Sequence, residues 1–516
     1  MASTLVRGKY IICKVMSATS AEVISDGAVF QRDGEIIEIG KYDDLRVRYT
    51  ADEVIGSPNY VVLPGLINTH FHVGLTPFQL GAPDLPLELW MPFRIGARDV
   101  DPYLSNLYGA VQMITSGTTT VGVLQVPNNL TTPVKLDTVD KTLKAFQDSG
   151  IRVTYGTLMN SHNYMVVGAR GGEEDFALQL PTDLSKRFES SVGQRYFSTE
   201  EHLSDIQELF TKYGGNRYER IRIILAPSNV HRCSDDLLLA VKQLAKQHKT
   251  AINIHVQETV YQKLYGLHAW GKTPLQHLND LGFLGPEVTC SHCVWVTDED
   301  IDVIAETGTN VCHLASSNLR LQSGIAPVNR LLERGVRIAL GTDEAGLNDD
   351  KDMLQEMRLV MKLHREPGIE NTPPTAYQTL QMATINGALN CQYGDRVGTL
   401  EAGKRADMVL INLHNIEEPY LEPGVSIVDA VVQRGRSVDV ETVMIDGEVV
   451  LRDHRLTRID SESLFKELKQ SLSRPLLPHE IERKELSRQL EPYLKPFYAR
   501  TLDRMPSPHY YYNGRS

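Results

Sequence analysis

The chain has 516 residues, of which 41% are hydrophobic and 23% charged, with a formal net charge of −12. This length fits one large catalytic domain plus a smaller one, and the charge argues against nucleic acid or an anionic membrane surface as a partner. Six cysteines are too few for a disulfide scaffold, no apolar run of about 18 residues indicates a membrane span, and the N-terminus lacks a signal peptide, so we expect a cytoplasmic protein.

Both ends of the chain carry the signals of short β-strands joined by tight turns. Near the N-terminus the turn is Asp33-Gly34, and near the C-terminus it is Asp446-Gly447, each between apolar runs. An Asp-Gly pair in this setting is typical of a β-hairpin. We therefore expect one small β-sandwich domain built from residues 1–62 and 395–455.

Between these ends, apolar strand candidates alternate with amphipathic helical stretches. The strand candidates are residues 61–68, 118–125, 151–158, 221–226, 251–255, 288–292, 310–314 and 336–341. Helices fit between most of them, for example at 133–149, 234–248, 298–307 and 327–334. Eight such units predict an α/β fold, a (β/α)8 TIM-type barrel over residues 63–394. Strands of such a barrel are buried on both faces, which explains their nearly continuous apolar character.

Two long segments interrupt the regular alternation. Residues 73–105 follow the first strand and residues 160–205 follow the third. Loops after barrel strands lie on the catalytic face, so we expect both segments to shape the substrate pocket. Trp90, in the first segment, either stacks on a flat ring or plugs the loop as a hydrophobic side chain. Residues 456–516 predict a helical extension and a polar, Tyr-rich tail.

The first barrel strand leads into His70-Phe71-His72. Side chains of a strand alternate between its faces, so His70 and His72 point one way and Phe71 the other. Two imidazoles on one face suit a divalent metal ion, because neutral imidazole is a common metal ligand. Taken alone, the pattern fits two exposed or core histidines as well.

Three further strand ends strengthen the metal interpretation. The fifth strand ends at His255, with Glu258 three residues on, the sixth ends at His292, and the eighth runs into Asp343. The carboxyl ends of barrel strands meet at one mouth, so these side chains are expected to lie together. Asp343 alone would equally suit the cap of the next helix, but the complete set predicts a metal site.

A metal site of this kind predicts that the protein catalyses hydrolysis. A divalent ion lowers the pKa of a coordinated water from ~15.7 to roughly 7. We expect Glu258 to carry a proton from that water to the leaving group. Asp343 is expected to bind the metal and accept a proton, while His292 either joins the metal or orients the substrate.

At these residues the sequence resembles the amidohydrolase superfamily. The resemblance is carried by Pro64 to His72, by His255 with Glu258, by His292, and by Gly341-Thr342-Asp343. Ser317 to Gly324, Ala383 to Ala388 and Gly398 to Asp407 are more narrowly similar to the branch that contains the S-adenosylhomocysteine/methylthioadenosine deaminases and the triazine chlorohydrolases.

The resemblance implies one divalent metal ion, Zn²⁺ first, with Fe²⁺, Co²⁺ or Mn²⁺ as alternatives. Its ligands would be His70, His72, His255 and Asp343, with Glu258 and His292 acting on water and substrate. It also implies a homo-oligomer, a dimer or larger.

The sequence departs from that branch near the predicted pocket. Its deaminases carry a Pro-His-Ala-Pro-Tyr-type stretch after the fourth strand, where this chain has Pro227 to Cys233, with Ser228 in place of the substrate-facing histidine. We take Ser228 and His231 as candidate substrate contacts. Glu344, beside Asp343, either contacts a substrate N–H or is a solvated loop charge.

The leading hypothesis is therefore a metal-dependent hydrolase of a small heterocycle that cleaves a C–N or C–Cl bond at an sp² carbon. A hydrolase of a urea, carbamate or amide with the same site is the alternative. A metal-binding scaffold without activity is the non-enzymatic rival, and it is disfavoured because the proton carrier Glu258 accompanies the complete ligand set.

Overall fold

The computed structural model describes residues 3–125, 136–167, 172–193, 196–214, 219–369 and 372–502. The Tyr-rich tail, the first residues of the helix predicted over 133–149, and parts of the segment 160–205 lie outside these ranges.

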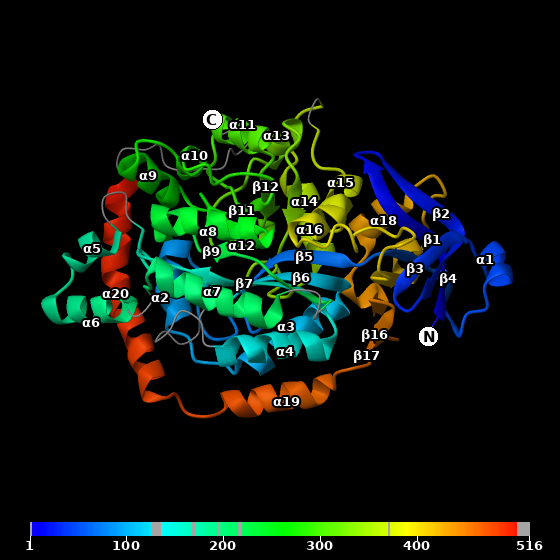
Figure 1. The fold of residues 1–516 in the computed structure, drawn as a ribbon, viewed down its shortest axis with the longest axis horizontal. Helices are drawn as coiled ribbons and strands as arrows, with labels where there is room; N and C mark the ends of the chain where they lie inside the picture. Colours follow the sequence, from blue (N-terminus) through cyan, green and yellow to red (C-terminus); the bar gives the residue numbers. More distant parts are fainter. Residues whose placement is uncertain are drawn as a thin grey trace.

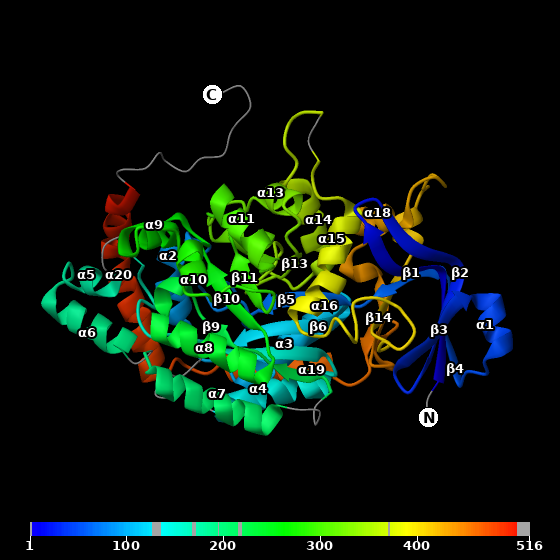
Figure 2. The same ribbon diagram turned by 45° about the horizontal axis from the view of Figure 1, so that its top comes forward.

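Eight parallel strand positions form a barrel in the centre of the molecule (Figures 1 and 2). The strands are β5 (Leu66–Phe71), β6 (Thr118–Gln125), β7 (Arg152–Met159), β8 (Ile221–Ile223) with its continuation β9 (Ala226–Pro227), β10 (Ile252–Val256), β11 (Val288–His292), β12 (Asn310–His313) and β13 (Ile338–Leu340). Single parallel bridges, Leu225 with Ile252 and Phe71 with Asp343, join the two strand groups and close the ring. The predicted (β/α)8 architecture is confirmed.

Apart from the half-buried Arg222 of β8, the barrel strands are buried along their whole length, as their apolar sequences predict. Helices cover the outside of the ring (Figure 1). They are α3 (Pro102–Thr115), α4 (Leu136–Ser149), α7 (Thr199–Tyr213), α8 (Asp235–His248), α9 (Val260–Ala269), α10 (Pro274–Asp280), α11 (Asp298–Thr307), α13 (Val328–Glu333), α14 (Met353–Leu363), α15 (Ala376–Met382) and α16 (Ile385–Asn390). The short helix α12 (Ala315–Arg320) lies instead at the mouth of the ring, where Ser317 contacts Asp343 and Asn318 contacts His292. Helix α11 has its predicted bounds because Thr297 and Asp300 form a capping box and Gly308 ends it at a φ of 68°.

The strand predicted over residues 61–68 is divided between two sheets. Its first part belongs to β4 (Glu53–Pro64), which pairs with β1 and β14, and the barrel strand β5 begins at Leu66. Gly65 lies at the crossing, where a Cβ atom would come within 2.1 Å of the Thr119 hydroxyl oxygen. Only glycine allows such a close approach of the backbone, so the chain changes sheets at this position.

Strands from both ends of the chain form a second, eight-stranded sheet, as predicted. The strands are β1 (Ser3–Ser17), β2 (Ser20–Arg32), β3 (Glu35–Lys41), β4, β14 (Met408–Asn412), β15 (Val440–Ile445), β16 (Glu448–Arg452) and β17 (Arg455–Leu456), in the order β17-β16-β15-β14-β4-β1-β2-β3. The short elements around this sheet are α1 (Tyr42–Arg48), α17 (His414–Glu417), α18 (Ile427–Arg434) and the 3₁₀ turn η2 (Ser437–Asp439). A buried ion pair between Arg152 and Asp407, at 2.9 Å, ties the sheet to the barrel.

Three segments far apart in the sequence pack over one end of the barrel. They are α2 (Leu87–Ile95), the pair α5 (Gly172–Ala177) and α6 (Thr182–Gly193), and the long helix α20 (Pro478–Leu502), which we together call the cap (Figure 1). One buried apolar cluster unites them; it includes Trp90, Met91, Phe176, Phe188, Leu490 and Phe497. The remaining C-terminal helix, α19 (Ser461–Leu472), packs against α3 instead. Within the described ranges, no helix combines the length and apolar character needed to cross a membrane.

Candidate active site

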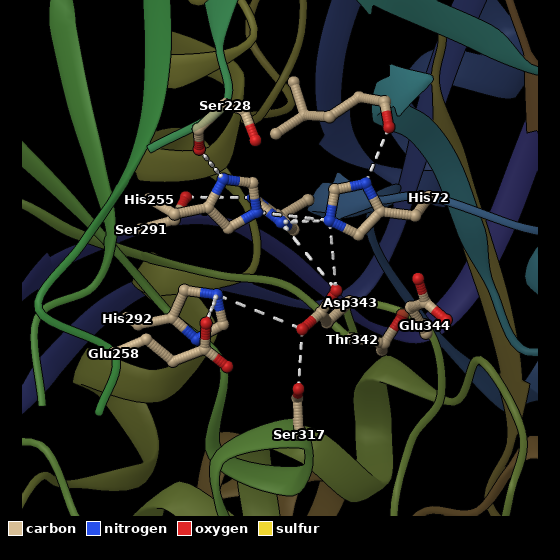
Figure 3. A network of polar contacts seen from close by, with 12 residues as sticks. His72, Ser228, His255, Glu258, Ser291, His292, Ser317, Thr342, Asp343 and Glu344 are labelled. Carbon is tan, nitrogen blue, oxygen red and sulfur yellow. Dashed lines mark hydrogen bonds and ion pairs between the residues drawn. The ribbon is translucent and has the colours of Figure 1, made fainter. Parts of the chain in front are cut away.

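The histidines predicted as metal ligands converge at the carboxyl ends of the barrel strands (Figure 3). The Nε2 atoms of His70 and His72 lie 3.0 Å apart, and those of His72 and His255 lie 3.2 Å apart. The Asp343 Oδ1 atom lies 3.3 Å from His72 Nε2 and 3.9 Å from His70 Nε2. The four side chains, which lie at or just after the ends of β5, β10 and β13, therefore converge on one position.

Hydrogen bonds on the far side of each ring fix which nitrogen carries the proton. His72 Nδ1 donates to the Leu124 carbonyl oxygen at 2.6 Å, and His255 Nδ1 donates to the Ser228 carbonyl oxygen. Ser291 Oγ donates to Asn253 Oδ1 at 2.8 Å, so this hydroxyl accepts from His70 Nδ1 at 2.9 Å. All three Nε2 atoms therefore carry lone pairs.

Three lone pairs and a carboxylate facing one another need a cation between them. Because no proton sits on the facing nitrogens, the short distances among them bring no hydrogen bonds. Neutral imidazoles that are oriented by a hydrogen bond through the other nitrogen are the usual protein ligands of Zn²⁺ and similar ions. The residues present fit a single divalent metal ion.

Burial gives the cluster the protonation states that a metal site needs. It lowers the pKa of His70 and of His255 well below the ordinary range, which keeps both rings neutral. Burial also raises the pKa of Asp343, but its polar surroundings, including a hydrogen bond from Ser317 Oγ at 2.6 Å, outweigh this effect and lower that pKa. Asp343 is therefore a carboxylate.

The backbone is left-handed at two residues of the site, His292 and Asp343. The φ angles are 71° at His292 and 54° at Asp343, values that residues other than glycine rarely adopt. At Asp343 the backbone is held by its N–H, which donates to the His70 carbonyl oxygen at 3.0 Å. The surrounding structure thus imposes a conformation that aims the carboxylate at the histidines.

Glu258 and His292 lie side by side next to this cluster (Figure 3). The Glu258 Oε2 atom is 3.8 Å from His292 Nε2, which is itself 4.0 Å from Asp343 Oδ2. His292 Nδ1 bonds Asn318 Oδ1 at 2.8 Å, while its buried Nε2 has no hydrogen-bond partner among the described residues. Burial raises the pKa of Glu258, although His292 opposes this effect.

A cavity under the cap joins all these groups to further side chains. Its lining includes His72, His255, Glu258, His292 and Asp343, together with Leu87, Trp90, Met91, Arg94, Leu158, Tyr164, Asn229, Arg232, Leu321 and Glu344. Trp90 is both a member of the apolar cluster of the cap and part of this wall. Glu344 also lines it, in an ion pair with Arg94 rather than free in solvent.

The segment after β9 presents different residues to the cavity from those named from the sequence. Asn229 and Arg232 line it, and Ser228 and His231 are not among its lining residues. Ser228 uses its carbonyl oxygen to hold His255 and its hydroxyl to accept from Arg232 Nη1 at 3.3 Å. His231 is buried. Sequence reasoning missed Arg94 and Arg232; the only local signal of Arg94 was its charge within an otherwise apolar stretch, and Arg232 had none.

A parallel barrel whose strand ends present three histidines and a carboxylate defines a metal-dependent barrel hydrolase. Residues 61–450 match the model of the amidohydrolase family. The chain belongs to the amidohydrolase family, whose members include hydrolases of C–N bonds, and the resemblance noted from the sequence is thereby confirmed.

Curated relatives and solved structures agree with this assignment. The chain is 32% identical over 473 residues to a 5'-deoxyadenosine deaminase of Methanosarcina mazei, covering 90% of this chain and 97% of the relative. It is 34% identical over 420 residues to a 5-methylthioadenosine/S-adenosylhomocysteine deaminase of Syntrophomonas wolfei, covering 80% and 86%. An adenosine deaminase structure from Xanthomonas campestris with bound zinc has a TM-score of 0.76 at 25% identity, over 91% of this chain and 98% of that one. A zinc complex of atrazine chlorohydrolase from Arthrobacter aurescens shares the fold, with a TM-score of 0.74 at 20% identity over 91% and 100%.

Proposed function

We propose that the protein is a metal-dependent aminohydrolase that releases ammonia from an amino-substituted nitrogen heterocycle, with adenine nucleosides as the first substrates to test. The observation that carries this proposal is that Glu258 and His292 line the same cavity as His72, His255 and Asp343, three of the four convergent ligand groups. The deaminase relatives named above, at 32% and 34% identity, support the choice of leaving group.

In this proposal His70, His72, His255 and Asp343 hold one divalent cation. Zn²⁺ is the first choice, because the Xanthomonas adenosine deaminase structure contains zinc, and Fe²⁺, Co²⁺ and Mn²⁺ are the alternatives. The bound cation supplies an acidified water molecule at neutral pH.

The protein side chains handle protons and the substrate ring. Glu258 holds a proton in its buried position and delivers it to the departing amine. Asp343 accepts a proton from the attacking water, and His292 Nε2, which lacks another partner among the described residues, orients the reacting carbon's substituents. Trp90 provides an aromatic face in the same wall.

The decisive experiment is a product screen with metal-loaded protein. Ammonia release from 5'-deoxyadenosine and 5'-methylthioadenosine is expected, with loss of the activity on chelation and its return with Zn²⁺. Release of alkyl- or arylamine from ureas and carbamates, without ammonia release from any amino-heterocycle, would contradict the proposal and favour the alternative hydrolase.

We also propose a homo-oligomer and a cytoplasmic location. The first is implied by the family resemblance, and the second is the expectation drawn from the composition of the chain. Light scattering of the purified protein tests the oligomer, and a monomer at working concentration would reject it. Fractionation of the source cells tests the location.

A further inference from the structure

One guanidinium group in the wall of the cavity has no carboxylate partner within the part of the chain that the structure describes. Arg232 belongs to the 3₁₀ turn η1 (Val230–Arg232), directly after β9, and lines the cavity. Among the described residues, no carboxylate oxygen lies within 4.0 Å of its guanidinium nitrogens. Its Nε atom is buried and has no hydrogen-bond partner, and Nη1 makes a long contact, 3.3 Å, with the neutral Ser228 hydroxyl. Its other close neighbour is the Tyr164 ring, whose centre lies 5.0 Å from the guanidinium carbon.

Arg94, the second arginine of the same cavity, differs from Arg232 because it has a carboxylate partner. Arg94 of α2 donates from Nε to Glu344 Oε1 and also places Nη2 against the same oxygen. Glu344 therefore neutralises Arg94 before any ligand enters. Arg94 is thus paired with Glu344, whereas the guanidinium N–H groups of Arg232 lack a carboxylate acceptor among the described residues.

Arg232 is half-buried, with its Nε atom fully buried, and a cation withdrawn from water without a counter-charge is costly, so such groups are normally paired. A guanidinium presents a planar fork of N–H donors that matches the oxygens of carboxylates and related groups. The missing partner of Arg232 is therefore best supplied by what the cavity binds.

The position of Arg232 places this partner close to the reacting centre. Ser228 accepts from Arg232 through its hydroxyl, and the carbonyl oxygen of the same residue holds the ring of the ligand His255. Only one residue thus separates the guanidinium from the metal-ligand cluster. The ring carbons and nitrogens of adenine offer no oxygen acceptor there.

We propose that the preferred substrate, unlike 5'-deoxyadenosine and 5'-methylthioadenosine, carries an oxygen acceptor, either an oxo group on the attacked ring or a carboxylate beside it, and that Arg232 recognises this oxygen and determines specificity. The proposal deepens the proposed function, because it uses the same cavity. It accounts for Arg232 in a stretch, Pro227 to Cys233, that departs from the Pro-His-Ala-Pro-Tyr type of the resembling deaminases.

The test measures binding of ligand pairs that differ by the oxygen and carry no amine to lose. In one arm, 2-oxopurine and 8-oxopurine are compared with purine. In the other, S-inosylhomocysteine is compared with 5'-S-(3-aminopropyl)-5'-thioinosine, which lacks only the carboxylate. Calorimetry on the metal-loaded wild type, on Arg232→Met and on Arg232→Lys gives the dissociation constant of each ligand. The ratio of the two constants in a pair is the preference for the oxygen-bearing member. Arg334→Met, a half-exposed arginine on the outer helix surface paired with Asp302, is the matched control.

In wild type and Arg334→Met, we expect one arm to show a preference for the oxygen-bearing ligand. Arg232→Met should lower that preference by about 10- to 100-fold, the usual loss for a hydrogen bond to a charged group, and Arg232→Lys by less. The arm that responds identifies a ring oxygen or a carboxylate as the source. A preference that is absent in wild type, or unchanged in Arg232→Met, would overturn the proposal.

This design separates the inference from the proposed function. Binding of amine-free ligands does not require turnover, so the preference is measurable even if no amino-heterocycle releases ammonia. Ammonia release without any oxygen preference would keep the proposed function and reject the role of Arg232. A purely structural role of Arg232 would lower the affinity for both members of a pair equally.

Discussion

The metal-ligand cluster and the cap meet at one cavity, but they are built in different ways. The cluster is set by strand ends of the barrel, where backbone pairing and hydrogen bonds to Nδ1 hold each ring in place. The cap is set by side-chain packing among three segments separated by hundreds of residues. As part of the proposed function, we therefore assign the reaction chemistry to the barrel and the choice of substrate to the cap and to the turn after β9.

The largest expected effect falls on the barrel side of this comparison. Glu258→Gln should lower kcat by about 10²- to 10⁴-fold, because it removes the proton carrier, while metal content stays at the wild-type level. Glu88→Gln is the matched control, since burial also raises the pKa of Glu88, to about 7, but Glu88 does not line the cavity. Steady-state kinetics with elemental analysis checks both variants. Equal loss of kcat in the two would remove the special role of Glu258.

On the cap side, Leu490→Ala should weaken the packing of α20 without touching the metal site. Leu490 is fully buried in the cap cluster, and such truncations cost about 2–5 kcal/mol. We expect faster amide hydrogen exchange in α2 and α20, a higher KM, and an unchanged metal content. Loss of the metal from this variant would contradict the prediction, because it would show that metal binding by the barrel depends on the packing of the cap.

An intermediate effect is expected from the hydrogen bonds behind the ligands. Ser291→Ala removes the oxygen that accepts from His70 Nδ1, so the ring loses its fixed orientation. Metal affinity should fall by about 10- to 100-fold, as for other residues that orient metal-binding histidines. Competition with a chelator of known affinity gives the value. An unchanged affinity would mean that the strand alone positions His70.

The smallest effect concerns acid stability at the start of α20. Hydrogen bonds from Arg474 lower the pKa of Glu480 to about 2, against an ordinary value of 4.5. Because the folded-state pKa is the lower one, the stabilisation is present above about pH 4.5 and is lost as the pH falls towards about 2. Arg474 is partly exposed, so we expect only about 1 kcal/mol. Glu480→Gln should reduce the acid sensitivity of unfolding in this window, and an identical pH profile would contradict the assignment.

Much of the barrel could be predicted because its signals are local. Apolar runs and helix caps gave β11 and α11 their observed bounds, and barrel closure then brought His70, His255 and Asp343 together. The division of the first strand at Gly65 was missed, because the contact with Thr119 that requires glycine is a tertiary one.

The wall of the cavity could be predicted only in part. Trp90 and Glu344 were named, but the ion pair of Glu344 with Arg94 joins positions 250 residues apart. Nothing local marks Arg232 as facing a cavity or α20 as covering one. Side-chain direction within irregular turns, and packing between distant helices, carry no periodic signal in the sequence.

The central claim is that distant segments hold one cation, and metal stoichiometry tests it most directly. Wild type and His277→Ala, which changes a histidine of helix α10 outside the cluster, are expected to bind about one equivalent of Zn²⁺ per chain, whereas His255→Ala should bind far less. A full equivalent of tightly bound metal in His255→Ala would contradict the account.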